Sequence, residues 1–196
     1  MTGRAKRMIA LAALPAAAVA MALPAAGSAA LTQDERDTLV SLRVEEKLAY
    51  DTYATLYEKT GLTVFQRIMR SEAQHSRVLE RQLAANGLAD PTDGKKRGVF
   101  PDAATTKLYR TLVAKGSTSD ANALLVGRTI EKLDIRDLTA ARTESSDSTL
   151  DRVYSNLIRA SKNHLRAFSR STGTQAGGGG AQSGGGGGGG GPTWRR

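Results

Sequence analysis

The sequence predicts an all-α domain, a four-helix bundle, over residues 31–172, and three observations support this. Apolar side chains recur there at alternating steps of three and four residues in four separate segments, which places them on one face of a helix. The stretch lacks the apolar–polar alternation of half-buried strands. Its two prolines, Pro91 and Pro101, stand close together, so one long loop interrupts the helices.

The first helix is predicted to begin at a capping box and to end at a glycine. Thr32 and Glu35 have the spacing at which each side chain caps the backbone of the other. The helix then continues to about Lys59, and Gly61 stands just past its end. Its core-facing row consists of Leu39, Leu42, Glu46, Ala49, Tyr53 and Leu56. This is the seam expected of a helix in an antiparallel bundle.

The second helix is expected to start at another capping box, Thr63 with Gln66, and to close at Asn86-Gly87. Its row consists of Phe65, Ile68, Glu72, His75, Leu79 and Leu83. A loop from Leu88 to Pro101 follows, and it contains Asp-Pro, Asp-Gly and Lys-Lys-Arg, which are turn or solvent signals. We expect a short extra helix, from about Ala103 to Ala114, that packs across the bundle as part of a long crossover.

The third and fourth helices complete the bundle. One starts near Ser119, and its row consists of Leu124, Gly127, Glu131, Asp134, Leu138 and Ala141. A turn at 145–148 precedes the last helix, expected from about Thr149 to Arg170. The row of that helix consists of Leu150, Tyr154, Leu157, Ser161, His164 and Phe168. A core of this size is large enough to fold alone.

Six polar side chains interrupt these rows near the middle of the helices: Glu46, Glu72, His75, Glu131, Asp134 and His164. A buried carboxylate needs a partner because its desolvation is costly. Four carboxylates and two imidazoles suit two metal ions, since carboxylates supply charge and bridging oxygens and imidazoles add neutral ligands. The alternative is a metal-free network of Glu–His pairs with flanking Lys or Arg, but fully satisfied networks of this size are hard to build.

Spacing strengthens the metal interpretation. Glu72-x-x-His75 and Glu131-x-x-Asp134 each place two donors one turn apart on one helix face. The hydroxyl of Tyr53 is expected either to bond a ligand carboxylate or lend an electron, or only to be satisfied within the core. Glu45 lies about 100° around the helix from Glu46 and is expected to face solvent.

These residues resemble the ferritin-like superfamily of di-iron carboxylate proteins over residues 31–170. The most specific parts are Glu46 with Tyr53, Glu72-x-x-His75 and Glu131-x-x-Asp134, the last resembling the rubrerythrin arrangement. More narrowly, the segments 45–49, 71–75, 130–135 and 163–168 are similar to an uncharacterised ferritin-like family, a domain of unknown function common in bacteria and archaea. This narrower resemblance implies a fold and metal ligands and leaves the reaction open.

The superfamily resemblance implies two iron or manganese ions that react with peroxide or dioxygen, with zinc as another metal such a site accepts. The fourth helix departs from the superfamily pattern, because Ser161 stands where a glutamate usually precedes the histidine by three residues. Either Asp134 turns into the site in its place, or one metal position is weak, solvated or empty. Two alternatives to an enzyme therefore stay open: a metal-sequestering module without turnover, and a metal-free helical interaction protein. A monomer or homodimer is expected rather than a cage.

Both ends of the chain differ from the middle. Residues 1–30 contain Arg4, Lys6 and Arg7, then an alanine-rich apolar stretch and small residues. This pattern predicts a signal peptide for the general secretory route, cleaved after Ala29 or Ala30, and the alternative is an uncleaved membrane anchor. The glycine-rich tail, residues 173–196, is expected to be disordered. Its aromatic-basic tip would either contact the cell envelope or have no partner.

Composition excludes several classes of protein. The 196 residues include no cysteine, which rules out disulfide scaffolds, thiolate–zinc sites and iron–sulfur clusters. The net charge of +9 is partly due to the ends, since residues 31–175 carry 23 basic and 19 acidic residues. The basic cluster at 95–97 is short and has no stacking aromatics beside it, so no nucleic-acid partner is predicted.

Overall fold

The computed structural model describes residues 30–176, and all regular structure within them is helical. Its helices are α1 (Gln33–Thr60), α2 (Thr63–Ala85), α3 (Ala103–Gly116), α4 (Asp120–Glu144) and α5 (Ser148–Ala176). The predicted all-α class is therefore confirmed, with five helices and no strand in this range. No helix within it has the length and apolar character needed to cross a membrane. Residues 1–29 of the predicted leader (1–30) and residues 177–196 of the predicted tail (173–196) lie outside the described residues. The predicted start of the tail is wrong, because residues 173–176 continue α5.

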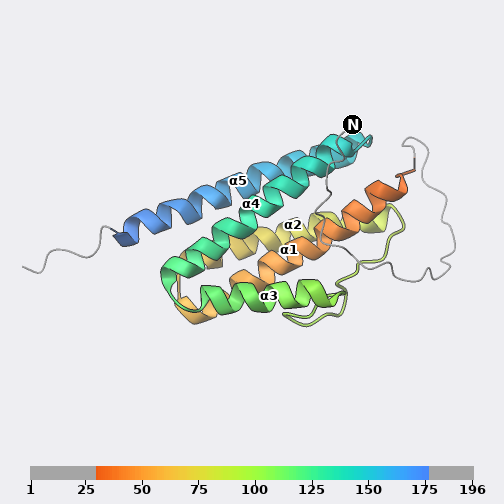
Figure 1. Ribbon diagram of the computed structural model, residues 1–196. Helices are drawn as coiled ribbons and strands as arrows, with labels where there is room; N and C mark the ends of the chain where they lie inside the picture. The colour runs from red at the N-terminus through yellow and green to blue at the C-terminus, as the bar shows by residue number, and fades with distance from the viewer. Residues whose placement is uncertain (1–29, 177–196) are drawn as a thin grey trace, which may run out of the picture.

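The four long helices pack side by side, and each has two long neighbours (Figure 1). α1 pairs with α2 and α4 pairs with α5, while α1 also contacts α4 and α2 also contacts α5. The short helix α3 lies against α1 and α4, as expected of a helix within a long crossover. All members of the four predicted rows are buried except Asp134, which is half-buried.

The apolar core is divided into two clusters along the helices. One contains Tyr53, Phe65 and Phe168, and the other contains Leu39 and Leu83. The polar members of the rows fall between these clusters along the sequence of each long helix. Hydrophobic burial on both sides thus holds a polar layer in the middle of the protein.

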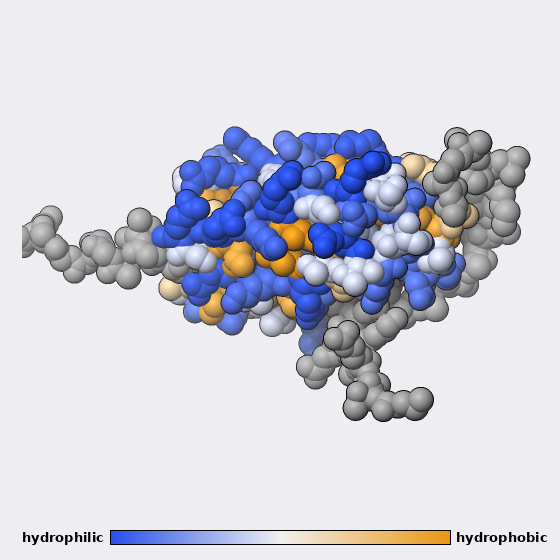
Figure 2. Space-filling model, turned by 90° about the horizontal axis from the view of Figure 1, so that it is seen from above, coloured by the Kyte–Doolittle hydropathy of each residue, from blue (hydrophilic) through white to orange (hydrophobic). Residues whose placement is uncertain are grey.

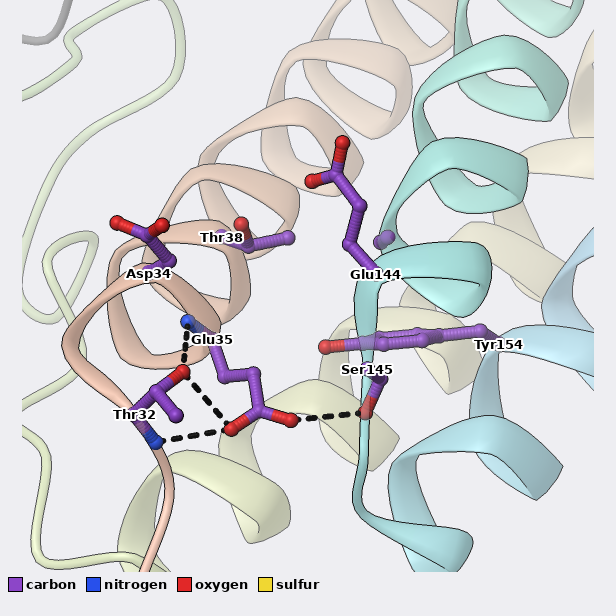
Figure 3. Close-up of a pocket in the computed structure, with 8 residues that line it drawn as sticks. Thr32, Asp34, Glu35, Thr38, Glu144, Ser145 and Tyr154 are labelled. Carbon is purple, nitrogen blue, oxygen red and sulfur yellow. Dashed lines mark hydrogen bonds between the residues drawn. The ribbon is translucent and has the colours of Figure 1, made fainter.

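The capping box of α1 is confirmed and has a further role. The Glu35 carboxylate accepts a hydrogen bond from the Thr32 backbone N–H at 2.8 Å, and the Glu35 N–H donates to the Thr32 hydroxyl at 3.2 Å. Glu35 also accepts from the Ser146 N–H at 2.7 Å and the Ser145 hydroxyl at 3.3 Å (Figure 3). One carboxylate therefore caps α1 and ties it to the α4–α5 turn. Gly61 ends α1 with φ 70°, a conformation that favours glycine.

The capping box predicted for α2 is wrong. Thr63 is already the first helical residue, and Leu62 occupies the N-cap position without a side-chain hydrogen bond. Only two residues connect α1 to α2, and Leu62 packs against the core. Because Leu62 packs there, α2 begins at Thr63, one residue before the start that the predicted capping box gives. α5 begins at Ser148, one residue early, and continues to Ala176, six residues beyond the predicted end.

Buried polar contacts hold the crossover loop against α1. Lys47 forms an ion pair with Asp51 and donates to the Lys96 carbonyl oxygen at 3.1 Å. The Gly98 N–H donates to Asp51 at 2.9 Å, and the Lys47 ammonium lies 4.9 Å from the centre of the Phe100 ring. These contacts compensate the burial of Lys47 and Asp51. They fix the loop that leads into α3.

Candidate metal centre

The six predicted ligand residues project into the interior from four helices: Glu46 from α1, Glu72 and His75 from α2, Glu131 and Asp134 from α4, and His164 from α5. Five of the six are buried, the three glutamates at 2% exposure and the two histidines at 6% and 8%. Positions three or four residues apart on a helix share a face, so the core rows carry these side chains inward with their apolar neighbours.

Five of these residues form two groups with convergent ligand atoms. The first group is Glu46, Glu72 and His75, and the second is Glu72, Glu131 and His164. Within each group, one nitrogen or oxygen per residue lies within 4.8 Å of the others. Glu72 belongs to both groups. Its two carboxylate oxygens lie 2.8 Å from Nδ1 of His75 and 2.8 Å from Nδ1 of His164.

The outer glutamates complete this arrangement. Glu46 lies 3.4 Å from Nδ1 of His75, and Glu131 lies 3.5 Å from Nδ1 of His164. The two imidazole rings stack with centroids 5.4 Å apart and an interplanar angle of 21°. The carboxylate of Glu72 therefore contacts both imidazoles, and each Nδ1 is also approached by a second carboxylate, that of Glu46 or of Glu131.

Several of these buried polar atoms have no hydrogen-bond partner among the described residues. They are both oxygens of Glu46, Oε1 of Glu72, and Nδ1 of His75 and of His164. The nitrogens and oxygens are close to one another but are not aligned as donors and acceptors. Unpaired buried polar atoms are costly, and native proteins satisfy nearly all of them. Unpaired nitrogens and oxygens that converge in this way fit a bound cation, so this set of side chains is suited to metal.

Ser71 orients one of the imidazoles. Its hydroxyl lies 3.3 Å from Nε2 of His75, one turn away on α2. A hydrogen bond at Nε2 leaves Nδ1 to face Glu46 and Glu72. The sequence segment 71–75 includes Ser71, but the sequence analysis does not predict a role for it. The i to i+4 spacing from a hydroxyl to a ligand histidine is the signal that identifies it.

The central carboxylate, Glu72, and the outer ones, Glu46 and Glu131, differ in pKa. Burial opposes ionisation of Glu72, but His164 and His75 outweigh it and lower its pKa to about 2. Burial raises the pKa of Glu46 to about 8 and that of Glu131 to about 7, and the charge of Glu72 adds to both shifts. Without metal, the central carboxylate is thus ionised and the outer ones tend to hold protons.

Both histidines favour the protonated form. Burial alone would lower the pKa of His75, but Glu46 and Glu72 raise it to about 11. Glu131 and Glu72 likewise raise the pKa of His164 to about 9 against the effect of burial. Protons therefore occupy this centre when no metal does, and a metal ion must displace them.

Asp134 lies outside both ligand groups. Its carboxylate accepts a short hydrogen bond from the Ser161 hydroxyl of α5. Burial raises its pKa well above the usual range, and the charges of Glu46 and Glu72 raise it further. Asp134 is thus near the centre but engaged by Ser161 of the facing helix α5.

Comparison with known proteins assigns this chain to a family. A family model described as DUF2202, an uncharacterized protein domain, matches residues 35–181. The chain belongs to the DUF2202 family. A relative, the uncharacterized protein MJ0754 of Methanocaldococcus jannaschii, is 40% identical over 140 residues, which cover 71% of this chain and 76% of the relative.

A solved structure agrees with the DUF2202 assignment. The crystal structure of hypothetical protein MJ0754 from Methanococcus jannaschii superposes with a TM-score of 0.74 at 37% sequence identity. The alignment covers 80% of this chain and 87% of that chain. The helical fold of the DUF2202 protein is therefore shared with an experimentally determined relative.

Tyr53 contacts the centre from its apolar side. Its hydroxyl donates a 2.7 Å hydrogen bond to Glu131, as expected if it supports a ligand carboxylate. The centroid of its ring lies 5.7 Å from that of Phe65 and 5.3 Å from that of Phe168, and the two phenylalanine rings are 5.2 Å apart. Gly127 makes room for Phe168, because a Cβ there would lie 2.7 Å from the ring. These aromatic residues form an apolar wall beside the candidate metal ligands.

The solvent-facing position expected for Glu45 is wrong. The side chain is half-buried, because α4 packs over this side of α1. Burial raises its pKa to about 8, and the charge of Asp137 on α4 adds to the effect. Glu45 also accepts a 3.3 Å hydrogen bond from the Ser41 hydroxyl. The row periodicity of α1 alone does not reveal contact with a second neighbouring helix.

Proposed function

We propose that this DUF2202 protein is a ferritin-like four-helix bundle that binds two metal ions, iron or manganese, at the carboxylate and histidine centre. One observation carries the proposal: two three-residue groups share Glu72, and five of their converging nitrogens and oxygens, including both oxygens of Glu46, have no hydrogen-bond partner in the described part of the chain. Convergent lone pairs in a dry interior favour a cation over an empty site.

The two groups indicate how the ions would be held. Glu46 and His75 would bind one ion, and Glu131 and His164 would bind the other. Glu72 would serve both, since each of its oxygens lies beside a different imidazole. Carboxylates contribute negative charge to offset two cations, and imidazoles contribute neutral donors.

The ligand atom types restrict which metals suit the centre but do not select a single metal. Carboxylate oxygens with one imidazole for each ion suit iron and manganese, and zinc accepts the same ligands. Iron or manganese ions, when bound, supply redox chemistry toward peroxide or dioxygen. The chain's own residues support such chemistry. Tyr53 donates a hydrogen bond to Glu131, and the packed rings of Tyr53 and Phe168 keep one side of the centre apolar. An oxidoreductase of the peroxidase or ferroxidase type is the activity we favour.

A second candidate function is metal sequestration without turnover. The Ser161–Asp134 hydrogen bond favours it, because this bond engages the carboxylate that would otherwise complete a ligand set. Three protein ligands for each ion leave room for water or substrate, and they also bind less tightly than four. The metal-free alternative is less well supported, because a hydrogen-bond network would not leave both oxygens of Glu46 unpaired.

We further propose that the protein acts outside the plasma membrane as a monomer or homodimer. The basic and apolar N-terminal sequence supports export. The tail supports a contact with the cell envelope, because it ends in tryptophan and two arginines after a long run of glycine.

The deciding experiment measures metal content. The full chain would be purified without a metal-affinity tag, beside a variant that combines Glu72→Ala with His75→Ala. A control combines Gln74→Ala with Glu80→Ala, both exposed on the same helix. We expect about two iron or manganese ions for each chain in the parent and the control, and none in the ligand variant.

Three other outcomes separate the alternatives. About one ion per chain would indicate a position weakened at Ser161. Two ions with peroxide consumption and iron oxidation at the background rate would select sequestration over turnover. No metal, even after reconstitution with iron, manganese or zinc, would overturn the proposal and leave a hydrogen-bond network.

A further inference from the structure

Exposed basic side chains gather on α2 and α5, which pack against each other. We call this surface the α2/α5 basic face. On α2 it comprises Arg67, Arg70, Arg77 and Arg81, and on α5 it comprises Arg152, Arg159, Lys162, Arg166 and Arg170, all of them exposed. Acidic residues are few on these helices: Glu72 is buried in the centre, and only Glu80 and Asp151 are exposed.

The other two long helices are close to neutral outside the core. α1 and α4 together carry twelve acidic and eight basic residues, but four of the acidic residues, Glu35, Glu46, Asp51 and Glu131, and one basic residue, Lys47, are buried. Eight acidic and seven basic residues are exposed or half-buried there, so the excess of positive charge lies on the α2 and α5 side. The modest net charge of the middle segment conceals this concentration.

The basic residues form two rows. On α2 the steps from Arg67 to Arg81 are three, seven and four residues, which keeps the arginines on the side opposite the core row. On α5 four arginines from Arg152 to Arg170 follow steps of seven, seven and four. At 1.5 Å per residue the rows are about 21 Å and about 27 Å long. Together they form a broad field of positive charge rather than a local cluster.

We propose that the α2/α5 basic face docks the protein on an anionic phospholipid membrane. Eight of its nine basic residues are arginine, whose guanidinium binds phosphate oxygens in pairs. Basic residues near an anionic bilayer contribute attraction that adds over the field. The proposal does not depend on metal in the centre.

Docking would be peripheral, without insertion into the bilayer. The one exposed large apolar side chain of the described residues is Val99, which lies on the crossover loop. Figure 2 views the molecule from above relative to Figure 1, and hydrophilic residues cover most of this surface, with apolar residues gathered mainly along its middle. Attraction between exposed charges is screened by salt, so binding would be reversible.

The same face is poorly suited to nucleic acid. Duplex readout inserts a helix or ribbon into a groove, and single strands stack on exposed aromatic side chains. The aromatic residues of α2 and α5, Phe65, Tyr154 and Phe168, are buried. A planar phospholipid surface is therefore the occupant that the charge pattern favours.

The test is cosedimentation of the full chain with vesicles of phosphatidylcholine, alone or with one third phosphatidylglycerol. The variant replaces the four α2 arginines with glutamine: Arg67→Gln, Arg70→Gln, Arg77→Gln and Arg81→Gln. A matched control removes the same charge from the loop and α3: Lys95→Gln, Lys107→Gln, Arg110→Gln and Lys115→Gln, all exposed in the parent. All three chains share the same N-terminal residues, so a difference between them belongs to the substituted surface.

We expect the parent and the control to bind only the anionic vesicles at about 0.1 M salt and to dissociate at about 1 M. The α2 variant should bind at least about tenfold more weakly than the control. Equal binding by the two variants, or equal binding to neutral vesicles, would overturn the proposal.

Two further arms keep the test decisive. If circular dichroism shows that the α2 variant does not fold, Arg152→Gln, Arg159→Gln, Lys162→Gln and Arg166→Gln on α5 replace it, with the same expected loss. A short DNA duplex is titrated in parallel. Duplex binding without vesicle binding, lost when the basic face is neutralised, would overturn the membrane proposal in favour of a nucleic-acid surface.

Discussion

The Ser161 hydroxyl of α5 donates a hydrogen bond to the Asp134 carboxylate of α4, beside the two histidines and three glutamates of the centre. The same hydroxyl oxygen lies 3.0 Å from the Leu157 carbonyl oxygen, a second acceptor for its single proton. Ser161 thus engages the one predicted ligand carboxylate that does not join the two groups. Five of the six predicted ligands converge at the centre.

Replacing this serine tests how Asp134 is stabilised. In Ser161→Ala, Asp134 loses its donor in a buried environment, so the free energy of unfolding without metal should fall by about 1–3 kcal/mol. Urea denaturation in the presence of a chelator measures the change. Ser169→Ala is a matched control, because that hydroxyl is exposed and donates to the carbonyl one turn earlier. Equal losses in the two variants would contradict a specific role for the Ser161–Asp134 pair.

Ser71 should act on metal affinity through His75. Ser71→Ala removes the hydrogen bond at Nε2 of His75, and loss of such a partner of a ligand weakens metal binding by about 10–100-fold. Competition with a metal-binding dye reports the affinity. Gln74→Ala, exposed on the same helix, should leave the affinity unchanged. Parent-like affinity in Ser71→Ala would show that packing alone orients the imidazole.

Tyr53→Phe should raise the pKa of Glu131, because the tyrosine hydroxyl is a hydrogen-bond donor that favours the charged carboxylate. The variant retains the aromatic ring, so packing against Phe168 should persist. The carboxyl resonance of Glu131, followed by NMR during a pH titration of metal-free protein, measures the shift. Tyr50→Phe, on the same helix, should leave that titration unchanged. A lower pKa for Glu131 in Tyr53→Phe would contradict the prediction.

Metal-free and metal-loaded protein should respond oppositely to pH. The folded-state pKa of Glu46 is raised from 4.5 to about 8, and that of His164 is raised from 6.5 to about 9. Protonation of both groups therefore stabilises the native state, and this stability is lost as pH rises through the folded-state values. Between about pH 6.5 and about pH 8 the metal-free melting temperature should fall.

Added Mn²⁺ reverses this trend, because metal binds the deprotonated ligands and stabilises the native state. The increase in melting temperature on adding Mn²⁺ should therefore be larger at about pH 8 than at about pH 6.5. Calorimetric scans with chelator and with Mn²⁺ measure both effects. A metal-free protein that becomes more stable over this interval would refute the assignment of protonated side chains at the centre.

Glu35 should contribute stability in a different pH range. Burial opposes its ionisation, but hydrogen bonds from Ser146 and Thr32 lower its pKa from 4.5 to about 2. The stability it contributes is therefore complete above pH 4.5 and is lost as pH falls toward 2. Glu35→Gln should cost about 1–2 kcal/mol at neutral pH, as for loss of a helix cap, and less at about pH 3.

Urea denaturation at the two pH values measures the contribution of Glu35. Glu144→Gln is the control, because Glu144 and Glu35 line one pocket (Figure 3) but the side chain of Glu144 is exposed. A loss of stability in Glu35→Gln that is independent of pH would point to altered packing rather than to a missing charge.

The sequence predicted the helical rows well because burial imposes one period on each helix. Every polar residue singled out from those rows is at least half-buried, and five of the six predicted ligands converge. Glu45 was misplaced because one row per helix assumes one buried side, whereas α1 contacts both α2 and α4. The Thr63 capping box failed because the packing of Leu62 overrode a local polar pattern. Whether Asp134 or Ser161 turned toward the centre depended on side-chain directions that spacing does not encode.

Because the metal-free centre holds protons, metal ions would bind there in exchange for those protons. At neutral pH without metal, His75 and His164 hold protons and so, in part, do Glu46 and Glu131. Two divalent ions that displace about four protons would enter by a nearly electroneutral exchange, with about two protons released for each ion. The interior then carries almost the same total charge empty or filled. A protein with such a centre can fold before it acquires metal and can release metal without a large electrostatic cost to its fold.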